Sequence, residues 1–511
     1  MEGLTMLMRK TLMCFVAGVV AATGLAQSTG GKFESKLVLE SSDPRLVEGF
    51  SWAKQQALAY AFDGDPVGPW CEAALPGREA FCMRDVSHQA MGAHALGLAR
   101  HNLNMLKRFA ENISESRDWC SFWEIDRYNR PAPVDYKNDA EFWYNLPANF
   151  DVLDCCYRMY LWTGDMTYLN DPALLNFYDR TVSDYVERWD LGLDRVMKRK
   201  RVMNVRGDFD SEKKFHFFRG DPSYEESREE FVLGIDLLAT QYAAYLAYGH
   251  IQELRGNEET ARTFLEKARL VKTLINNTWW NEAGQHFYGF LNQDHKLIGN
   301  GGFILLYRDA AEDGPKARSV LNELGESIQK SPSSQVEGQA HYAEVLYRYG
   351  VPEVAYAQMM DLARPNRERQ EYPEVSYSVI GAIVTGTMGV TVMGMPSRAS
   401  EEGNFVDRVV KTLPGLGNIA WAELRNLPIR ANEVSVRHEA GRKTILTNQK
   451  GPSLIWQATF AGSFDTLLVN GEPMKAQTGK EPLGRVTSWV RVTVGAGDSV
   501  RVEIPKGGDG K

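Results

Sequence analysis

The most constraining feature of this chain is an alternation of two kinds of predicted helix, which repeats six times between residues 44 and 390. In each repeat an amphipathic helix is followed by a long loop, and then by a helix that is apolar or small on nearly every face. An amphipathic helix covers a surface, whereas a helix that is apolar all round lies inside a protein. The pattern therefore predicts a mainly α fold, an (α/α)6 barrel of six helical hairpins.

The six inner helices and their loops define where a site is expected. If the inner helices run parallel, their N-termini and the long loops gather on one rim, where the helix dipoles favour carboxylates and other anions. We expect inner helices at residues 85–99, 148–162, 231–252, 303–307, 337–349 and 374–390. The outer helices are expected at 44–62, 102–113, 258–276, 316–329 and 352–362, with one more opening at Asp171-Pro172.

The pattern changes near residue 404, where short β-rich runs and turn signals such as Asn470-Gly471 replace the helices. This predicts a small C-terminal antiparallel β-sandwich over residues 404–506, following a barrel over residues 40–395. The β-rich part contains no cluster of candidate catalytic residues. We expect it to brace or cover the barrel.

The first 26 residues have the pattern of a secretory signal, with Arg9-Lys10 before an apolar run at 11–25 and small residues at its end. A membrane-anchoring helix is the alternative interpretation. We expect an exported protein, periplasmic or secreted, whose mature chain does not span a membrane. Five cysteines follow the leader, and Cys71 and Cys82 could pair or stay free and buried.

Composition excludes some classes of protein. The formal net charge of −8 argues against a nucleic-acid binder, which would show a basic excess. No phosphate-binding loop, dinucleotide-binding glycine motif or serine-hydrolase elbow is present in a fitting context. The CxxC pattern is absent, and His88, His94 and His101 lack metalloprotease spacing, so we predict neither a metal nor another cofactor.

Acidic residues on the predicted rim are the candidate catalytic groups. Glu337 starts an inner helix beside Gly338, and Glu374 starts the last one, with Glu371 just before it. Glu230, in an acidic stretch of the third loop, is a further candidate. Glycoside hydrolysis needs two carboxyl groups across the scissile bond, one as acid and one as base or nucleophile. The alternative for Glu337, Glu371 and Glu374 is a carboxylate that only caps a helix or interacts with its dipole, and for Glu230 it is a solvated acidic stretch.

Other rim residues have side chains suited to binding a sugar. Arginine offers a fork that matches a carboxylate, and aromatic faces pack against sugar rings. Ion pairs and loop packing are the alternative roles. The candidates for substrate binding are Arg84, Asp85, His88, Trp123, Arg127, Tyr144, Arg219, His341 and Tyr372.

Over residues 40–395 the pattern resembles the six-hairpin glycosidase superfamily, in the hairpin rhythm, Arg84-Asp85, Glu337-Gly338 and Tyr372-Pro373-Glu374. Residues 81–89 (FCMRDVSHQ) and 232–239 (VLGIDLLA) look most like glycoside hydrolase family 154, whose members are reported as β-glucuronidases. The resemblance implies acid and base carboxylates on the rim loops. It does not indicate which glutamates serve.

These patterns predict an exo-acting glycoside hydrolase that removes a terminal sugar, with β-glucuronic acid as a candidate, from polysaccharide side chains. The expected partner is a carbohydrate. One alternative is a uronate-specific lyase, which would depend on Tyr144, His88 or His341 instead of a carboxylate pair. The other is a non-catalytic carbohydrate-binding protein, which would keep the aromatic and arginine side chains without two carboxylates at catalytic separation.

Overall fold

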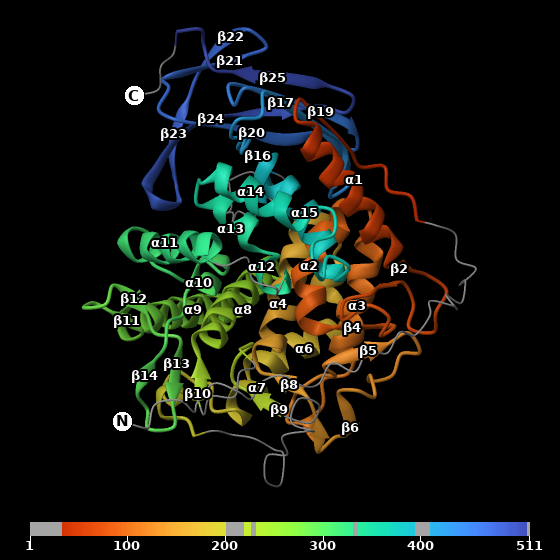
Figure 1. Ribbon diagram of the computed structural model, residues 1–511, viewed down its shortest axis with the longest axis vertical. Coiled ribbons are helices and arrows are strands. Elements are labelled where there is room, and N and C mark those ends of the chain that lie inside the picture. Colours follow the sequence, from red (N-terminus) through yellow and green to blue (C-terminus); the bar gives the residue numbers. More distant parts are fainter. Residues whose placement is uncertain (1–32, 201–218, 226–230, 331–335, 394–408, 508–511) are drawn as a thin grey trace, which may run out of the picture. The chain divides into compact units, whose positions relative to one another are not determined.

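The computed structural model describes residues 33–200, 219–225, 231–330, 336–393 and 409–507. Helices dominate the part before residue 390, and β-strands the part after it (Figure 1). A mainly helical chain with a C-terminal β region is thereby confirmed. The predicted leader, residues 1–26, lies outside the described residues, so export stays a prediction.

Buried and surface helices alternate along the chain as predicted. All ten residues of α15 are buried, whereas the 21-residue α9 buries only five. The inner helices are α2 (Met83–Ala95), α4 (Pro147–Thr163), α8 (Ile235–Leu254), α10 (Phe303–Tyr307), α12 (Val336–Gln339) with α13 (Tyr342–Arg348), and α15 (Pro373–Ala382). The outer helices are α1 (Pro44–Ala59), α3 (Ala99–Glu111), α6 (Pro172–Val182), α9 (Glu258–Thr278), α11 (Pro315–Lys330) and α14 (Pro352–Leu362).

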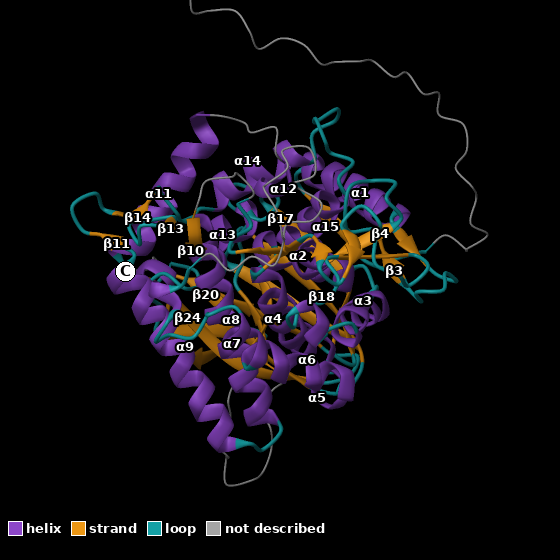
Figure 2. Cartoon of the chain, turned by 90° about the horizontal axis from the view of Figure 1, so that it is seen from below, coloured by secondary structure: helices purple, strands orange, loops and turns teal. Residues whose placement is uncertain are grey.

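The inner helices contact one another in chain order, α2 with α4, α4 with α8, α8 with α10, and α10 with α13. The series closes on itself, because α13 contacts α15 and α15 contacts α2. In Figure 2, α2, α4 and α15 lie near the centre of the helical part, and α3, α6 and α9 lie farther out. The short α5 (Thr167–Asn170), α7 (Asp184–Arg188), η1 (Glu115–Arg117) and η2 (Val196–Lys198) lie in connections.

Local sequence signals set several helix ends. The Asp171 carboxylate accepts hydrogen bonds from the backbone N–H groups of Ala173 and Leu174, and Pro172 occupies the first helical position of α6. Helix α4 begins at Pro147 and ends at Gly164, whose φ of +65° is a left-handed conformation that favours glycine. These ends agree with the sequence prediction.

Three inner helices differ in detail from the prediction. The chain at residues 231–234 is strand β10, so α8 starts at Ile235. The predicted helix over 337–349 is divided into α12 and α13, with His341 between them. The last predicted helix ends in a π-helical turn, η3 (Ile383–Thr387), instead of continuing to residue 390.

Two sheets form the β region. One has the order β1-β17-β18-β19-β25-β21-β22, and the other β15-β16-β20-β24-β23, in which only the β16–β20 pair is parallel. The first comprises β1 (Val38–Ser41), β17 (Trp421–Ile429), β18 (Asn432–Glu439), β19 (Lys443–Lys450), β25 (Ser499–Glu503), β21 (Thr466–Val469) and β22 (Glu472–Lys475). The second comprises β15 (Val390–Met393), β16 (Val409–Thr412), β20 (Leu454–Ala461), β24 (Arg485–Val494) and β23 (Gln477–Glu481). The short helix η4 (Pro482–Gly484) connects β23 to β24.

Strands from outside the predicted sandwich range of 404–506 complete both sheets. β1 pairs antiparallel with β17, Val38 opposite Arg425, and β15 pairs with β16. β1 thereby covers an edge that would otherwise expose unpaired backbone groups. The domain boundaries given by the sequence pattern stay a prediction.

Short strands brace the loops between outer and inner helices. The pairs β4–β5 and β8–β9 link loops that are distant in sequence. These strands are β2 (Ala61–Phe62), β3 (Trp70–Cys71), β4 (Ala80–Cys82), β5 (Glu124–Asp126), β6 (Tyr136–Asn138), β7 (Glu141–Phe142), β8 (Tyr144–Asn145), β9 (Arg219–Asp221), β10 (Phe231–Gly234), β11 (Trp280–Asn281), β12 (His286–Phe287), β13 (Phe290–Asn292) and β14 (Leu297–Ile298).

The five cysteines after the predicted leader are all free and buried, so Cys71 and Cys82 do not pair. Among the described residues, no helix is both long enough and apolar enough to cross a bilayer.

We expect Gly92→Ala to destabilise the fold by at least about 2 kcal/mol, because overpacking a crossing forces the backbone to move. A Cβ atom at Gly92 would lie 1.9 Å from the Tyr377 carbonyl oxygen, where α2 crosses α15. Chemical denaturation measures the loss. Gly325→Ala on α11 is the control, since its Cβ would meet nothing within 4 Å. Equal stability of the two variants would contradict the close crossing.

We also expect the free energy of unfolding to fall as the pH drops from 6.5 toward 4. Burial lowers the pKa of His94 and of His438 to about 4, and each ring bonds a backbone carbonyl, of Pro428 and Met388 respectively. The folded state therefore binds fewer protons than the unfolded state in this window, which destabilises it as protons are added. In denaturation at several pH values, His438→Gln should show a shallower slope than the wild type. An unchanged slope would refute this role for His438.

Candidate active site

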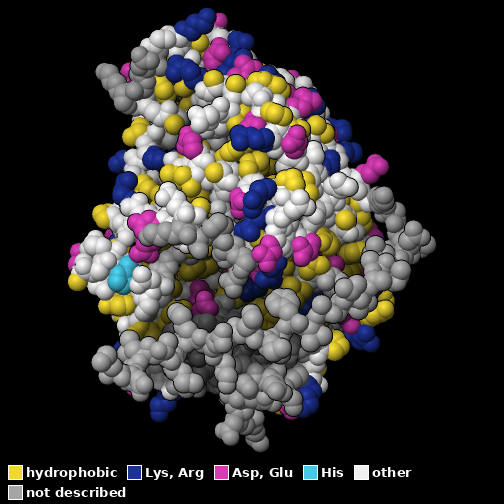
Figure 3. All heavy atoms as spheres, in the orientation of Figure 1, with side chains coloured by type: hydrophobic (Ala, Val, Ile, Leu, Met, Phe, Trp, Pro, Cys, Tyr) yellow, Lys and Arg dark blue, Asp and Glu magenta, His cyan; other side chains and the backbone are white. Residues whose placement is uncertain are grey.

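Polar side chains converge where the inner helices begin. α2 supplies Asp85 and His88, α4 supplies Asp151, and α15 supplies Glu374. His341 comes from the break between α12 and α13, and Arg308 follows α10. On the face shown in Figure 3, hydrophobic, acidic and basic side chains surround a hollow near the centre, partly beside atoms drawn in grey. The rim predicted from the helix pattern therefore brings together ionisable groups from separate hairpins.

Two histidines flank one buried carboxylate. Nε2 of His341 lies 2.5 Å from Oε1 of Glu374, and Nδ1 of His88 lies 3.4 Å from the same oxygen. The two imidazole rings meet edge to face, with their centroids 4.8 Å apart. Glu374 is only 2% exposed. We name these three residues the His–Glu–His cluster.

Hydrogen bonds within this cluster stabilise the negative charge of Glu374 and the positive charge of His88. Burial alone would raise the pKa of Glu374, but hydrogen bonds to His341 and His88 outweigh it and hold the pKa well below its usual range. Burial would likewise lower the pKa of His88, whereas its bonds to Asp151 and Glu374 raise it. Glu374 is therefore ionised at neutral pH.

Asp151 forms a second layer behind His88. Its Oδ2 lies 3.2 Å from Nε2 of His88 and accepts a 2.6 Å hydrogen bond from the Tyr224 hydroxyl. Its Oδ1 accepts a hydrogen bond from Arg308, whose other terminal nitrogen bonds Asp154 at 2.7 Å. Asp151 is fully buried, and burial alone would raise its pKa. Arg308 and His88 outweigh that effect and lower the pKa of Asp151 to about 2. An ionised Asp151 fixes the orientation of the His88 ring.

Asp85 has the opposite electrostatic character. It is 1% exposed, and burial raises its pKa to about 7, opposed by Arg84 and reinforced by the charge of Glu374. Nε of Arg84 lies 3.3 Å from Oδ1, and the Tyr372 hydroxyl donates to Oδ2 at 3.3 Å. Asp85 is thus a carboxyl group that is partly protonated at neutral pH.

Glu337 lies in the first turn of α12, and its side chain is 22% exposed. Oε1 lies 2.7 Å from Nη2 of Arg369, and Arg369 also lies over the Tyr372 ring, 5.9 Å from its centroid. Within the described part of the chain, Oε2 of Glu337 has no hydrogen-bond partner. Tyr372 therefore contacts Asp85 through its hydroxyl and the Arg369 guanidinium group through its ring.

Aromatic rings enclose the imidazoles. The Tyr307 ring lies 5.6 Å from the His88 ring and 5.1 Å from the His341 ring, and it stacks on Phe303 at 5.8 Å. Tyr224 meets His88 edge to face at 6.3 Å. Such surfaces can pack against the apolar face of a sugar ring.

The His–Glu–His cluster also has the donor set of a metal site. One ring nitrogen from each histidine and one oxygen of Glu374 lie within 4.8 Å of one another. Two imidazole nitrogens and a carboxylate oxygen are ligands that suit Zn²⁺ and similar ions. The sequence analysis predicted no metal because it considered only ligands at short, regular spacing along the chain. Such spacing cannot reveal ligands that come from distant segments, as His88, His341 and Glu374 do.

Several predicted site residues lie outside this cluster. The Tyr144 hydroxyl is buried among Asn149, Met83 and the Ser121 backbone, and the Trp123 ring packs edge to face on Tyr144. These two rings therefore support the loop packing named as their alternative role.

The remaining candidates are engaged in other contacts. Arg127 pairs with Asp65 and Glu79, at 2.7 and 2.6 Å, and Arg219 pairs with Asp118 at 2.9 Å. Glu371 is exposed. Glu230 lies outside the described residues. The predicted residues that lie at the candidate site, linked by the contacts described above, are Arg84, Asp85, His88, Glu337, His341, Tyr372 and Glu374.

Sequence reasoning missed Asp151, Arg308, Tyr224 and Tyr307. Asp151 carried a usable signal, because it is an acidic residue inside the otherwise apolar start of a predicted inner helix. Arg308 had a weaker one, as a charged residue that directly follows the short apolar helix at 303–307. Neither signal identifies a partner.

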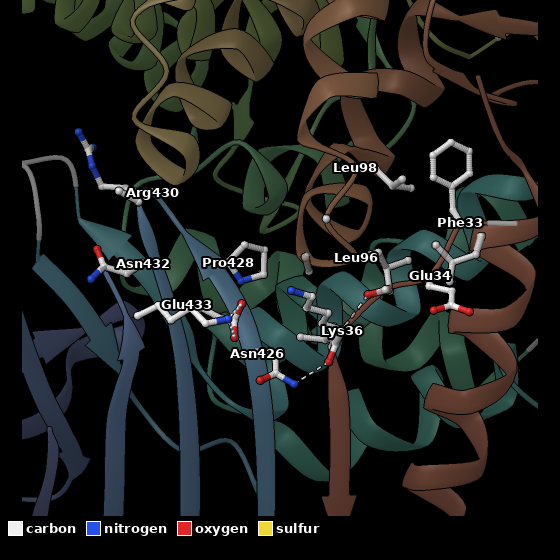
Figure 4. Close-up of a pocket in the computed structure, with 17 residues that line it drawn as sticks. Phe33, Glu34, Lys36, Leu96, Leu98, Asn426, Pro428, Arg430, Asn432 and Glu433 are labelled. Carbon is white, nitrogen blue, oxygen red and sulfur yellow. Dashed lines mark hydrogen bonds and ion pairs between the residues drawn. The ribbon is translucent and has the colours of Figure 1, made fainter. Parts of the chain in front are cut away.

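A separate pocket of about 450 Å³ lies between the N-terminal segment, the turn after α2 and strands β17 and β18 (Figure 4). Asn426 donates a 2.7 Å hydrogen bond to the Lys36 carbonyl there, and Glu433 pairs with Lys450 at 3.3 Å. Its described lining contains no histidine and no pair of carboxylates facing each other. We therefore place the candidate active site at the inner-helix N-termini.

No protein-family model matches this chain, and no curated protein matches it in sequence. Solved structures do resemble it in fold. An α-L-rhamnosidase from Dictyoglumus thermophilum has a TM-score of 0.57 and 15% identity, and the match covers 92% of this chain and 50% of that one. An α-L-rhamnosidase from Aspergillus terreus has a TM-score of 0.52 and 12% identity, covering 91% and 51%.

A GH78-family rhamnosidase of Bacillus sp. GL1 has a TM-score of 0.51 and 13% identity, and the match covers 80% of this chain and 41% of that one. The chain thus spans about half the length, or less, of these structures. At such identities the likeness establishes a shared fold with these rhamnosidases.

We expect Arg308→Leu to cost about 3–5 kcal/mol of stability, because it removes the guanidinium charge that balances the buried Asp151 carboxylate. Arg308 is 6% exposed and bonds both Asp151 and Asp154. Denaturant unfolding measures the effect. Arg195→Leu removes an exposed pair with Glu187 and should leave stability unchanged. If both variants unfold like the wild type, the buried pair does not support the site.

Proposed function

We propose that the chain is a glycoside hydrolase with an (α/α)6 barrel, acting on a terminal sugar at the inner-helix N-termini. The closed series of contacts through α2, α4, α8, α10, α13 and α15 supports the barrel. So does the resemblance in fold to rhamnosidases. Carboxyl groups, histidines and aromatic rings meet where such a barrel presents its helix dipoles.

The observation that carries the proposal is the burial of Asp85, which is only 1% exposed and is contacted by Arg84 and Tyr372. A general acid must hold a proton near the working pH and release it to the leaving oxygen. Burial raises the pKa of Asp85 to about 7, while the pKa of neighbouring Glu374 is held far below its usual range. Carboxyl groups whose pKa values are driven apart within one site are typical of acid and base assignments. We assign Asp85 as the proton donor.

Glu337 is the proposed base. One of its oxygens is held by Arg369, and the other is buried and has no hydrogen-bond partner among the described residues. An acceptor oxygen that is free of hydrogen bonds can take the proton of an attacking water. Tyr372 connects the two proposed carboxyl groups, because its hydroxyl bonds Asp85 and its ring lies 5.9 Å from the Arg369 guanidinium group that pairs with Glu337.

Exo action on a polysaccharide side chain, with β-glucuronic acid as first candidate, is part of the proposal. Arg84 beside Asp85 and Arg369 beside Glu337 place one guanidinium group next to each proposed catalytic carboxyl. A guanidinium group can bind a sugar carboxylate through paired hydrogen bonds. Tyr144, one of the three bases named above for the lyase alternative, is fully buried in the loop core, which disfavours Tyr144 in that role.

The test is hydrolysis of a panel of glycosides that includes β-glucuronides and α-rhamnosides. Asp85→Asn should lower kcat/KM by roughly 10²–10⁴-fold on a natural glycoside, as expected for loss of a general acid. It should lose far less on a dinitrophenyl glycoside, whose leaving group needs no proton. Glu337→Gln should lose activity on both substrates, because water activation is needed for either.

Glu371→Gln is the matched control, because Glu371 is exposed on the loop that precedes α15 and should keep wild-type rates. Equal losses of Asp85→Asn on both leaving groups would overturn the assignment of the acid. Release of an unsaturated uronate would support a lyase. Saturable sugar binding with no turnover on any substrate would support the binding protein.

The pH profile provides an independent check. Because Asp85 must be protonated and its pKa is raised to about 7, kcat/KM should be highest below pH 7. Above that pH it should fall tenfold per unit as the proton is lost. The basic limb should be absent from the residual activity of Asp85→Asn on the dinitrophenyl substrate. A basic limb retained in that variant would assign the titration to another group.

A further inference from the structure

We propose that the His–Glu–His cluster, His88, His341 and Glu374, binds one divalent transition-metal ion, for which Zn²⁺ is the probe. The inference goes beyond the proposed glycosidase activity and requires no step of hydrolysis. It follows from the placement of three ligand atoms, the residues that orient them and the charge around them.

The ligand atoms come from three inner-helix starts and already face one another. Nδ1 of His88 and Nε2 of His341 lie 3.4 and 2.5 Å from Oε1 of Glu374. All three atoms lie within 4.8 Å of one another. Ligand atoms about 2.0–2.2 Å from a common Zn²⁺ ion lie at similar mutual separations, so small rotamer adjustments suffice.

A second layer orients the first. Metal-binding histidines usually donate their other ring N–H to a carboxylate, which fixes the tautomer. His88 has that arrangement, because its Nε2 lies 3.2 Å from Oδ2 of Asp151 while Nδ1 faces Glu374. Asp151 is itself held by Tyr224 and Arg308. The structure thereby presents Nδ1 of His88 as the ligand atom.

The positive charges near the His–Glu–His cluster are balanced by carboxylates, so they do not oppose the binding of a cation. Nη2 of Arg308 lies 3.4 Å from Nε2 of His88, and its positive charge is balanced by Asp151 and Asp154. Arg158 pairs with Asp154 as well, at 2.9 Å. Within the described part of the chain, the side-chain contacts of the Glu374 carboxylate are with the two imidazoles. Binding of the ion would replace the protons that these imidazoles share with the carboxylate.

The donor set selects the class of ion. Imidazole nitrogens suit Zn²⁺ and related transition metals, whereas Mg²⁺ and Ca²⁺ require oxygen ligands. Three protein ligands also leave a fourth position for water or a ligand oxygen, as in catalytic rather than structural zinc sites. Tyr307, whose ring contacts both imidazoles, provides an apolar wall beside them.

The experiment uses the full chain without an affinity tag, stripped with a chelator and dialysed. Titration with Zn²⁺ by calorimetry, with metal content measured after gel filtration, should give one ion per chain and a Kd in the micromolar range or tighter. Mg²⁺ should not compete. Co²⁺ should give the visible absorption bands of a low-symmetry nitrogen–oxygen site.

His341→Ala and Glu374→Gln should each weaken Zn²⁺ binding by at least 100-fold. Asp151→Asn should weaken it by about 10–100-fold, the usual effect of removing a carboxylate behind a histidine ligand. His250→Ala is the matched control, because His250 pairs with Glu253 on α8, outside the cluster, and should bind like the wild type. Circular dichroism and thermal unfolding establish that each variant is folded.

Less than a tenth of an ion per chain, or the same affinity in the wild type and folded His341→Ala, would overturn the proposal. The three residues would then be joined by hydrogen bonds alone, without a bound metal ion. This result is independent of the glycosidase proposal. That proposal is tested by how the loss of activity in Asp85→Asn depends on the leaving group of the substrate. Metal binding without hydrolysis, or hydrolysis without metal binding, would therefore separate the two.

Discussion

One imidazole links three of the inner helices. His88 on α2 contacts Asp151 on α4 through one ring nitrogen and Glu374 on α15 through the other. Both carboxylates are removed from water, where an unpaired charge is strongly destabilising. Any shift of α2 along its neighbours would break both contacts at once. The buried charges therefore fix the register of the helices as well as the geometry of the site.

Close backbone approach makes this arrangement possible. α2 crosses α15 at Gly92, where the Tyr377 carbonyl occupies the space of a side chain. The same two helices carry Asp85 and His88 on one side and Glu374 on the other, near their N-terminal ends. Tight packing in the middle of the crossing thus brings the polar ends together, and burial then drives the pKa values of Asp85 and Glu374 apart.

The β region supports the opposite ends of the inner helices. His94, near the end of α2, bonds the Pro428 carbonyl of β17, and His438 of β18 bonds the Met388 carbonyl beyond α15. These histidines are buried and neutral, whereas His88 carries a raised pKa among carboxylates. The same residue type therefore joins the two regions at one end and forms the polar cluster at the other, because the neighbouring charges differ.

The sequence by itself determined the kinds of helix, their order, the β-rich C-terminal part and the rim, because hydrophobic periodicity and capping are local. It also indicated Asp85, His88, Glu337, His341 and Glu374 as helix-start residues. Only the tertiary structure decided which of them meet. His88 and Asp151 are 63 residues apart, Arg308 and Asp151 157, and Tyr372 and Asp85 287. Partners at such separations, and the pKa shifts that burial and pairing cause, arise only when the helices close on one another.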